Sequence, residues 1–214
     1  MTAMKTNTGV RVIELPEDRL PEAVDVLVRS FRDNPNFVHL FPDDAARVRA
    51  LRCVQRACLR DALDAGRVYA ATRGSDLLGV AAWLPPGGFP LLPGRQLRAA
   101  PDMLRVLAAA PRSLPRLLRF TAGAAKLHPA QPYWYLEAVG VDPSARGMGI
   151  GTRLLEPVLA RADEAGLPCY LETMTERNVA WYRRLGFEVR ISGVSFVPGG
   201  PPNWTMLRRP GQAA

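Results

Sequence analysis

Three glycines at alternate positions, Gly147, Gly149 and Gly151, stand between an apolar segment and an amphipathic one. The apolar segment ends at a turn that begins with Asp142, and the amphipathic one begins near Ile150. Glycines keep side chains away from the backbone, and the first turn of a helix has N–H groups without intrahelical acceptors. A loop of this kind can bind phosphate. These residues therefore indicate either recognition of a phosphorylated molecule or a plain strand-to-helix turn.

Two common phosphate-binding motifs fail on their spacing. A P-loop requires lysine and then serine or threonine after its last glycine, but Gly151 is followed by Thr152 and an arginine. A dinucleotide fingerprint that starts at Gly147 requires a glycine at position 152. The pattern that remains is Arg-x-x-Gly-x-Gly, formed by Arg146, Gly149 and Gly151.

This pattern resembles the pyrophosphate loop of the GNAT family of N-acetyltransferases, which bind acetyl-coenzyme A (acetyl-CoA). Further motifs follow in the order typical of the family: Leu-Glu-Thr at 171–173, Asn178, Tyr182 and Leu-Gly-Phe at 185–187. Together with Trp-Tyr-Leu at 134–136, they look most like the branch that contains puromycin N-acetyltransferase. The resemblance covers residues 132–209.

The resemblance implies where acetyl-CoA would bind. In the family a bulge in the strand before the loop separates it from its neighbour, and Gly140 is expected to mark that bulge, or else only to relieve crowding. The N–H near Val139 would point at the thioester oxygen, and Asn178 would hydrogen-bond the pantetheine arm or support its own helix. The expected contacts are Val139, Gly140, Val141, Arg146, Gly147, Met148, Gly149, Ile150, Gly151, Thr152, Asn178 and Tyr182.

Acetyl transfer to an amine needs a base, donors for an oxyanion and an acid for the departing thiolate. Tyr182 occupies the family's position for the acid, with a packing tyrosine as the alternative. Glu172 and Glu137 are the candidate bases, although Glu172 could instead recognise a cationic acceptor and either could be a structurally paired or exposed carboxylate. Alternation along the strand predicts that Glu137 shares a face with Tyr135 and Val139.

Histidine and cysteine usage predicts no metal and no disulfide framework. His39 and His128 are expected to be ordinary surface residues, and neither has a partner at metal-ligand spacing. Cys53, Cys58 and Cys169 cannot all pair and show no Cys-x-x-Cys spacing.

Periodicity and turn residues predict a chain of strands and helices. The resemblance implies their arrangement in a GNAT-type α/β fold: a mixed, mostly antiparallel twisted sheet of six or seven strands flanked by helices on both faces. A single domain is expected over residues 1–214, with a helical insertion at about 85–130 between the third and fourth strands. The expected strands are 10–15, 67–72, 77–84, 133–141, one near 167–173, one after 187, and 203–209; the expected helices are 16–31, 43–65, two within 95–126 and one from about 150.

Composition narrows the class of protein. The net charge is +8, but the arginines are scattered among acidic residues, which predicts a solvated surface and no nucleic-acid partner. Arg146, Arg153, Arg183 and Arg184 are near enough to the loop to attract an anion. The longest nearly apolar run, 77–84, is too short to cross a bilayer, and residues 1–10 lack a signal core. A cytoplasmic protein without a membrane partner, monomeric or homodimeric, is expected.

The acceptor is expected to bind between the loop at 31–41, the end of the third strand and the insertion. Five aromatic residues could line this pocket or pack in the core: Phe37, Phe41, Trp83, Phe89 and Trp134. Three functions follow from the resemblance. The first is acetylation of a small-molecule amine such as an aminonucleoside, an antibiotic or a polyamine. The second is acetylation of a protein or peptide, and the third is non-catalytic binding of coenzyme A.

Overall fold

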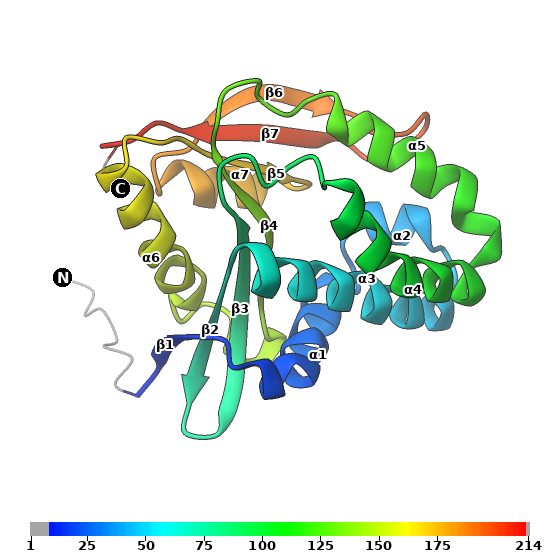
Figure 1. Cartoon of the computed structure of the whole chain (residues 1–214), viewed down its shortest axis with the longest axis horizontal. Coiled ribbons are helices and arrows are strands. Elements are labelled where there is room, and N and C mark those ends of the chain that lie inside the picture. Colours follow the sequence, from blue (N-terminus) through cyan, green and yellow to red (C-terminus); the bar gives the residue numbers. More distant parts are fainter. Residues whose placement is uncertain (1–8, 213–214) are drawn as a thin grey trace.

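A seven-stranded sheet forms the centre of the computed structural model, which describes residues 9–212 (Figure 1). The strand order is β1-β2-β3-β4-β5-β7-β6, and every neighbouring pair is antiparallel except β4 and β5, which are parallel. The predicted mixed, mostly antiparallel sheet is therefore confirmed. The strands are β1 (Arg11–Glu14), β2 (Arg67–Arg73), β3 (Asp76–Leu84), β4 (Trp134–Val141), β5 (Cys169–Thr173), β6 (Glu188–Val194) and β7 (Asn203–Arg208).

Helices cover both faces of the sheet, as predicted. The α-helices are α1 (Leu20–Phe31), α2 (Pro35–Leu40), α3 (Asp44–Ala65), α4 (Pro93–Ala109), α5 (Leu114–Ala125), α6 (Ile150–Glu164) and α7 (Glu176–Arg183), and short 3-10 turns are η1 (Glu17–Arg19), η2 (Pro111–Ser113) and η3 (Pro143–Ala145). Helices α1 and α3 pack on one face through a cluster that includes Leu27 and Val80. Helix α6 packs on the other face through a cluster that includes Leu154 and Trp83.

Strands β4 and β5 pair over only two positions. Trp134 is opposite Cys169, and Tyr135 is opposite Tyr170. Strand β4 then continues to Val141 alongside β3, while β5 continues alongside β7. In Figure 1, β7 and β6 run across the top of the view, whereas β2 and β3 run down it. The two parallel strands therefore separate near the middle of the sheet, where the resemblance placed the separation.

The bulge in β4 lies at Glu137 and not at Gly140. In the register with β3, Trp83 is opposite Leu136 and Ala82 is opposite Ala138, so Glu137 is the extra residue. A bulge resets which side chains share a face. Tyr135 accordingly packs with the α1 and α3 cluster, whereas Val139 packs with the α6 cluster. The prediction that Tyr135, Glu137 and Val139 share one face was wrong.

Gly140 is required by the close approach of helix α1. It pairs regularly with Val80, and a Cβ atom at Gly140 would lie 2.8 Å from Leu27 Cδ2 and 2.9 Å from Ser30 Cβ. The alternative that Gly140 relieves crowding is therefore the correct one. This contact brings α1 directly onto β4, next to the turn that leads into the glycine loop.

A helix, α2, occupies the segment at 31–41 that was expected to be a loop. Its N-cap is Asn34, whose side chain accepts a hydrogen bond from the N–H of Asn36, and Pro35 fits the first helical position. The expected helix at 43–65 is confirmed as α3, with Asp43 as its N-cap. Within the described residues, no helix is both long and apolar enough to cross a membrane.

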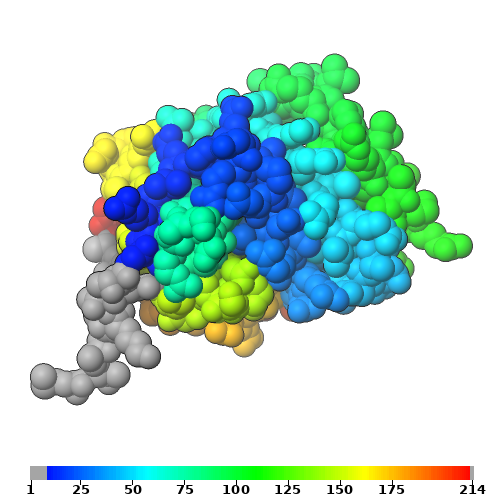
Figure 2. Space-filling view, turned by 90° about the horizontal axis from the view of Figure 1, so that it is seen from below, coloured from blue at the N-terminus to red at the C-terminus, as the bar shows by residue number. Residues whose placement is uncertain are grey.

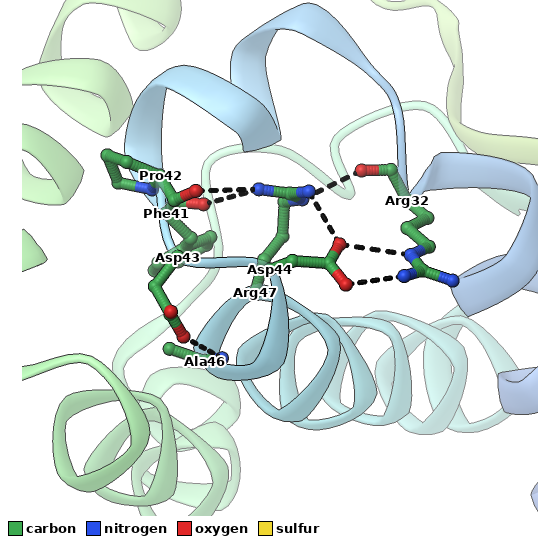
Figure 3. A network of polar contacts seen from close by, with 7 residues as sticks. All are labelled: Arg32, Phe41, Pro42, Asp43, Asp44, Ala46 and Arg47. Atoms are coloured by element: carbon green, nitrogen blue, oxygen red, sulfur yellow. Dashed lines mark hydrogen bonds and ion pairs between the residues drawn. The ribbon is translucent and has the colours of Figure 1, made fainter.

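Arg47 fixes the two turns on either side of α2 (Figure 3). Its buried guanidinium donates to the carbonyl oxygens of Arg32 at 2.9 Å, Phe41 at 2.9 Å and Pro42 at 3.2 Å. It also pairs with the Asp44 carboxylate at 2.7 Å, and Asp44 in turn binds Arg32. One side chain therefore satisfies the carbonyl groups that the chain reversals leave without partners.

We predict that Gly140→Val destabilises the fold, because its side chain would overlap helix α1. The free energy of unfolding in urea should fall by about 1 to 3 kcal/mol. Gly94→Ala is the control, since a Cβ atom at Gly94 has no neighbour within 4 Å. Equal stability of Gly140→Val and the unmodified chain would contradict this packing.

Candidate active site

The turn after β4 is held in place from three directions. Asp142 accepts hydrogen bonds from Ser144 N at 3.0 Å and from Arg29 Nε at 2.7 Å, and its own N–H donates to Leu78 O at 2.8 Å. Burial alone would raise the pKa of Asp142, but the hydrogen bonds from Ser144 and Arg29 outweigh it and lower the pKa. A charged carboxylate thus links α1, β3 and the start of the glycine loop.

Gly147 and Gly149 leave one side of the loop open. Both have positive φ angles, +80° and +72°, which favour glycine, and a Cβ atom at either position would meet nothing within 4 Å. Gly149 is the N-cap of α6 and provides no side-chain hydrogen bond to the helix. The first turn of α6 therefore has no side-chain cap from its N-cap residue, and the glycine positions beside it are open. A loop of this form leaves room for an anionic group.

Gly151 has a different reason to be glycine. A Cβ atom there would lie 2.9 Å from Cζ2 of Trp181, which reaches across from α7. Trp181 Nε1 also donates to Thr152 Oγ1 at 3.3 Å, and its ring lies 4.5 Å from that of Tyr182. Sequence reasoning missed Trp181. Two features of the sequence could have indicated it: a tryptophan directly before Tyr182, and a glycine, Gly151, inside a predicted helix.

Two arginines near the loop are held by backbone oxygens. Arg146 Nη2 donates to Ser30 O at 3.3 Å, and Arg153 Nη2 donates to Val10 O at 2.7 Å. Arg146 is exposed beside the loop, whereas Arg153 is turned toward the chain before β1. Arg146 is therefore the better placed of the two to meet an anion.

Tyr182 is buried on α7 and packs against Phe187, with ring centroids 5.6 Å apart. Burial raises the pKa of its phenol, which keeps it protonated at neutral pH. Asn178, one turn earlier, is exposed, and its backbone N–H donates to Thr175 Oγ1 at 3.2 Å. The structure thus places a neutral tyrosine and a surface amide on the same helix.

Glu137 and Glu172 belong to an acidic cluster with Asp61. The Oε2 atom of Glu137 and the Oε1 atom of Glu172 are buried and have no hydrogen-bond partner among the described residues. Burial, followed by the negative charge of Asp61, raises the pKa of Glu137 to about 8, and Glu172 adds to this effect. A hydrogen bond from Cys58 and the charge of Arg95 act in the opposite direction. Unpartnered buried carboxylate oxygens indicate a place for a ligand.

His128 is buried in this site, so the prediction of a surface histidine was wrong. Its side chain is 7% exposed, and its Nδ1 lies 2.6 Å from the Tyr133 hydroxyl. Its Nε2 lies 3.2 Å from Glu172 Oε1, within ion-pair range but not aligned as a hydrogen bond. Phe89 stacks on the imidazole with ring centroids 3.7 Å apart. The other histidine, His39, is half-buried on α2.

Three tyrosines surround His128 and Glu172. Burial, and after it the negative charge of Glu172, raises the pKa of Tyr133 to about 12 and raises those of Tyr135 and Tyr170 further. All three phenols are therefore neutral near Glu172. The two ring pairs His128–Tyr135 and His128–Tyr170 both have centroids 4.9 Å apart. Neutral, electron-rich rings beside carboxylates suit a cation.

Only one of the five aromatic residues proposed for the acceptor pocket lies in this cluster. Phe89 stacks on His128, whereas Phe41, Trp83 and Trp134 are buried in hydrophobic clusters. Phe37 packs edge-on against Phe31 at 5.8 Å. Core packing, the alternative for these aromatics, accounts for four of the five.

Helix α2 lies beside the ends of β5 and β7. Asn36 Nδ2 donates to the buried Asn203 Oδ1 at 2.6 Å, and Asn34 Nδ2 lies 3.5 Å from Met174 Sδ. Both contacts join residues more than 130 positions apart in the chain. The segment at 31–41 therefore contacts the chain directly after β5, the strand that carries Glu172. Within residues 9–212 there is no cluster of three or more potential metal ligands.

Comparison with known proteins identifies the class. Residues 36–187 match the model of the acetyltransferase (GNAT) family, so the chain belongs to this family, whose members use acetyl-CoA. A crystal structure titled histone acetyltransferase HPA2 and related acetyltransferase, from Corynebacterium glutamicum, is 28% identical with a TM-score of 0.73, covering 95% of this chain and 98% of that one. An agmatine N-acetyltransferase structure shares the fold at 15% identity and a TM-score of 0.59, covering 94% of this chain and 99% of that one.

Curated relatives match shorter stretches. The N-alpha-acetyltransferase RimI of Mycobacterium tuberculosis is 36% identical over 94 residues, which is 42% of this chain and 58% of the relative. Mycothiol acetyltransferase of Propionibacterium freudenreichii is 34% identical over 74 residues, which is 33% of this chain and 24% of the relative. The chain thus spans less than three fifths of the length of these relatives.

We predict that Glu137 makes stability depend on pH. The unfolded chain ionises this carboxyl above its ordinary pKa of 4.5, whereas the folded chain keeps it protonated up to about pH 8. The folded state therefore binds more protons in this window, and stability falls as pH rises through it, by up to roughly 1.4 kcal/mol per unit of pKa shift. Urea unfolding at pH 5 and pH 8.5 should show a smaller fall for Glu137→Gln. The exposed Glu176→Gln is the control, and an equal fall in all three proteins would contradict the assignment.

Proposed function

We propose that the protein transfers the acetyl group of acetyl-CoA to the amine of a small cationic molecule, by direct attack while both substrates are bound. The observation that carries this proposal is that Glu137 and Glu172, at the point where β4 and β5 separate, each have one buried carboxylate oxygen without a hydrogen-bond partner among the described residues. An acetyltransferase of this family needs to bind acetyl-CoA on one side of this point and an amine on the other. We assign the amine to the side that carries the two carboxylates.

Acetyl-CoA supplies the activated acyl group. The open glycine loop at 146–152 and the uncapped first turn of α6 would hold its diphosphate, and exposed Asn178 would contact its pantetheine arm. The backbone of β4 after the bulge, from Val139 to Val141, borders the same loop. Preorganised backbone N–H groups in such a place stabilise developing negative charge on oxygen.

The two carboxylates have different roles. Glu172, beside His128 and three neutral tyrosines, attracts and orients the acceptor ammonium group. Glu137, with a pKa of about 8, accepts a proton from that group when it is ionised, and its ionised fraction grows as the pH rises toward 8. The neutral amine then attacks the acyl group.

Tyr182 acts as the acid. Its phenol remains protonated at neutral pH, and Trp181 fixes its helix against the start of α6. It can therefore donate a proton to the thiolate that leaves. The protons then balance. The acceptor nitrogen loses one proton to Glu137 before attack and a second as the amide forms, sulfur gains one from Tyr182, and the second proton from nitrogen restores the Tyr182 phenol, so the proton on Glu137 is the one released to solvent.

Burial of the acceptor side supports a small substrate over a peptide. Glu172 is 8% exposed beneath His128 and Phe89, and α2 covers the adjacent strand end. A peptide acceptor needs an open groove at this position. The motif resemblance to the puromycin N-acetyltransferase branch extends the proposal to aminonucleoside-like amines. We further propose a cytoplasmic enzyme that is a monomer or homodimer.

We predict that the purified protein releases free thiol from acetyl-CoA with one or more small amines from a panel of polyamines, arylalkylamines and aminonucleosides. Tyr182→Phe and Glu137→Gln should each lower kcat by about 10² or more. The rate should rise with pH and level off above about pH 8, and Glu137→Gln should remove this rise, because the base is active only when ionised. Glu176→Gln should have no effect.

The alternative functions predict different results in the same assay. Faster thiol release with lysine-bearing or N-terminal peptides than with any small amine would favour a protein acetyltransferase. Saturable binding of coenzyme A with no thiol release on any amine or peptide would favour a non-catalytic binding module and contradict the proposal.

We predict that Gly149→Val weakens binding of coenzyme A at least about tenfold by calorimetry, because a branched side chain disfavours the positive φ angle and projects over the loop. Gly74→Val is the matched control, since Gly74 also has a positive φ angle (+60°) and open space around it but lies in the β2–β3 turn. Equal loss of affinity in both variants would show that general destabilisation, and not the loop, is responsible.

A further inference from the structure

Exposed leucines concentrate on the two helices of the insertion. Of the seven large apolar side chains that are exposed among the described residues, five lie between positions 92 and 118. They are Leu92, Leu97, Leu104, Leu114 and Leu118, with exposures of 65%, 76%, 66%, 37% and 60%. We refer to these five residues as the leucine surface. Helices α4 and α5 form one margin of the molecule in two perpendicular views, on the right in each (Figures 1 and 2).

Helix α4 exposes two leucines on the side that faces away from the protein. Leu97 and Leu104 are seven residues apart and share a face, while the buried side of the helix carries Arg95, Asp102 and Val106. Arg95 Nε binds Asp61 Oδ1 at 2.7 Å on α3. A helix on a protein surface normally buries its large apolar side chains and exposes its charged ones. In α4, two charged residues take part of the buried side, and Leu97 and Leu104 point into solvent.

The same segment carries most of the net charge of the protein. Residues 91–127 contain seven lysine and arginine residues and one aspartate, a net charge of +6 in a chain whose total is +8. The single acid, Asp102, is buried and binds Arg56 and Arg105. The exposed basic residues that flank the leucine surface are Arg98, Arg105, Arg112, Arg116, Arg119 and Lys126.

Leucines flanked by arginines match the surface of an anionic bilayer. Leucine side chains enter the boundary between headgroups and acyl chains, and arginines at the edge of the stripe reach the lipid phosphates. A second copy of this chain would bring an equal positive charge against the first, and a nucleic acid would leave the leucines without apolar partners. We propose that the leucine surface docks the protein peripherally on membranes that contain anionic lipids.

Co-sedimentation of the full chain with lipid vesicles tests this proposal. We expect binding to vesicles of phosphatidylglycerol and phosphatidylcholine at about 0.1 M salt, and much weaker binding to vesicles of phosphatidylcholine alone or at high salt. Leu97→Ser with Leu104→Ser should lower the partition coefficient at least about tenfold, and so should the triple change of Arg112, Arg116 and Arg119 to Gln.

Matched controls test whether binding depends on the leucine surface itself or only on the total exposed apolar area and charge of the protein. Ile13→Thr removes an exposed apolar side chain from strand β1, and a triple change of the exposed Arg11, Arg49 and Arg73 to Gln removes the same charge elsewhere. Both should bind anionic vesicles almost as the unmodified chain does. Circular dichroism checks that every variant is folded.

Three outcomes would overturn the proposal. They are no binding to anionic vesicles, equal binding to neutral vesicles, and loss of binding that is as large in the controls as in the surface variants. Dimerisation in analytical ultracentrifugation that the two serine changes abolish, without vesicle binding, would instead identify a second copy as the occupant. Vesicle binding requires no turnover, so its failure leaves the proposed acetyl transfer unaffected.

Discussion

The separation of β4 from β5 after two paired positions is the constraint on which the site depends. A continuous parallel pair would satisfy the backbone groups of both strands and leave no place for a substrate between them. Two features accompany the separation. The extra residue at Glu137 disrupts the local pleat, and β5 is held along its other edge by β7, with which it pairs from Cys169 to Thr173. Gly140 then lets α1 pack directly on β4, which braces the freed strand from one side.

This arrangement buries several carboxyl groups close together at the proposed site, which costs free energy when they are ionised. The negative charges of Asp61 and Glu172 both disfavour ionisation of Glu137 and raise its pKa, and Asp61 itself pairs directly with Arg95. Replacing Glu137 by an uncharged residue should ease folding above the raised pKa of this carboxyl, and a buried carboxyl with a pKa raised in this way fits the proposed role as a base. His128 and the neutral tyrosines limit the cost at Glu172, because they are polar neighbours that add no negative charge.

Local signals in the sequence predicted the helices and strands, whereas the position of the bulge and the burial of His128 depend on tertiary contacts. The strand, glycine loop and helix at 134–164 follow from residues that are adjacent in the chain, and the resemblance placed Tyr182 and Glu172 on the correct elements. The position of the bulge depends on the register with β3, which no local pattern encodes. The burial of His128 was missed because one of its partners, Glu172, lies on β5 and is far away in sequence, while the other, Tyr133, lies just before β4.

Arg95 connects helix α4 of the insertion to the acidic cluster and to the segment that covers it. This buried guanidinium pairs with Asp61 of the acidic cluster and also donates to Gly88 O at 2.6 Å, one residue before Phe89, which covers His128. The ion pair that joins α4 to α3 is thus the same one that moderates the charge next to Glu137. An insertion that loses this arginine would be expected to lose one contact that holds α4 and one that holds the segment above the carboxylates. The helix that carries two of the exposed leucines is therefore linked to the proposed site through a single side chain.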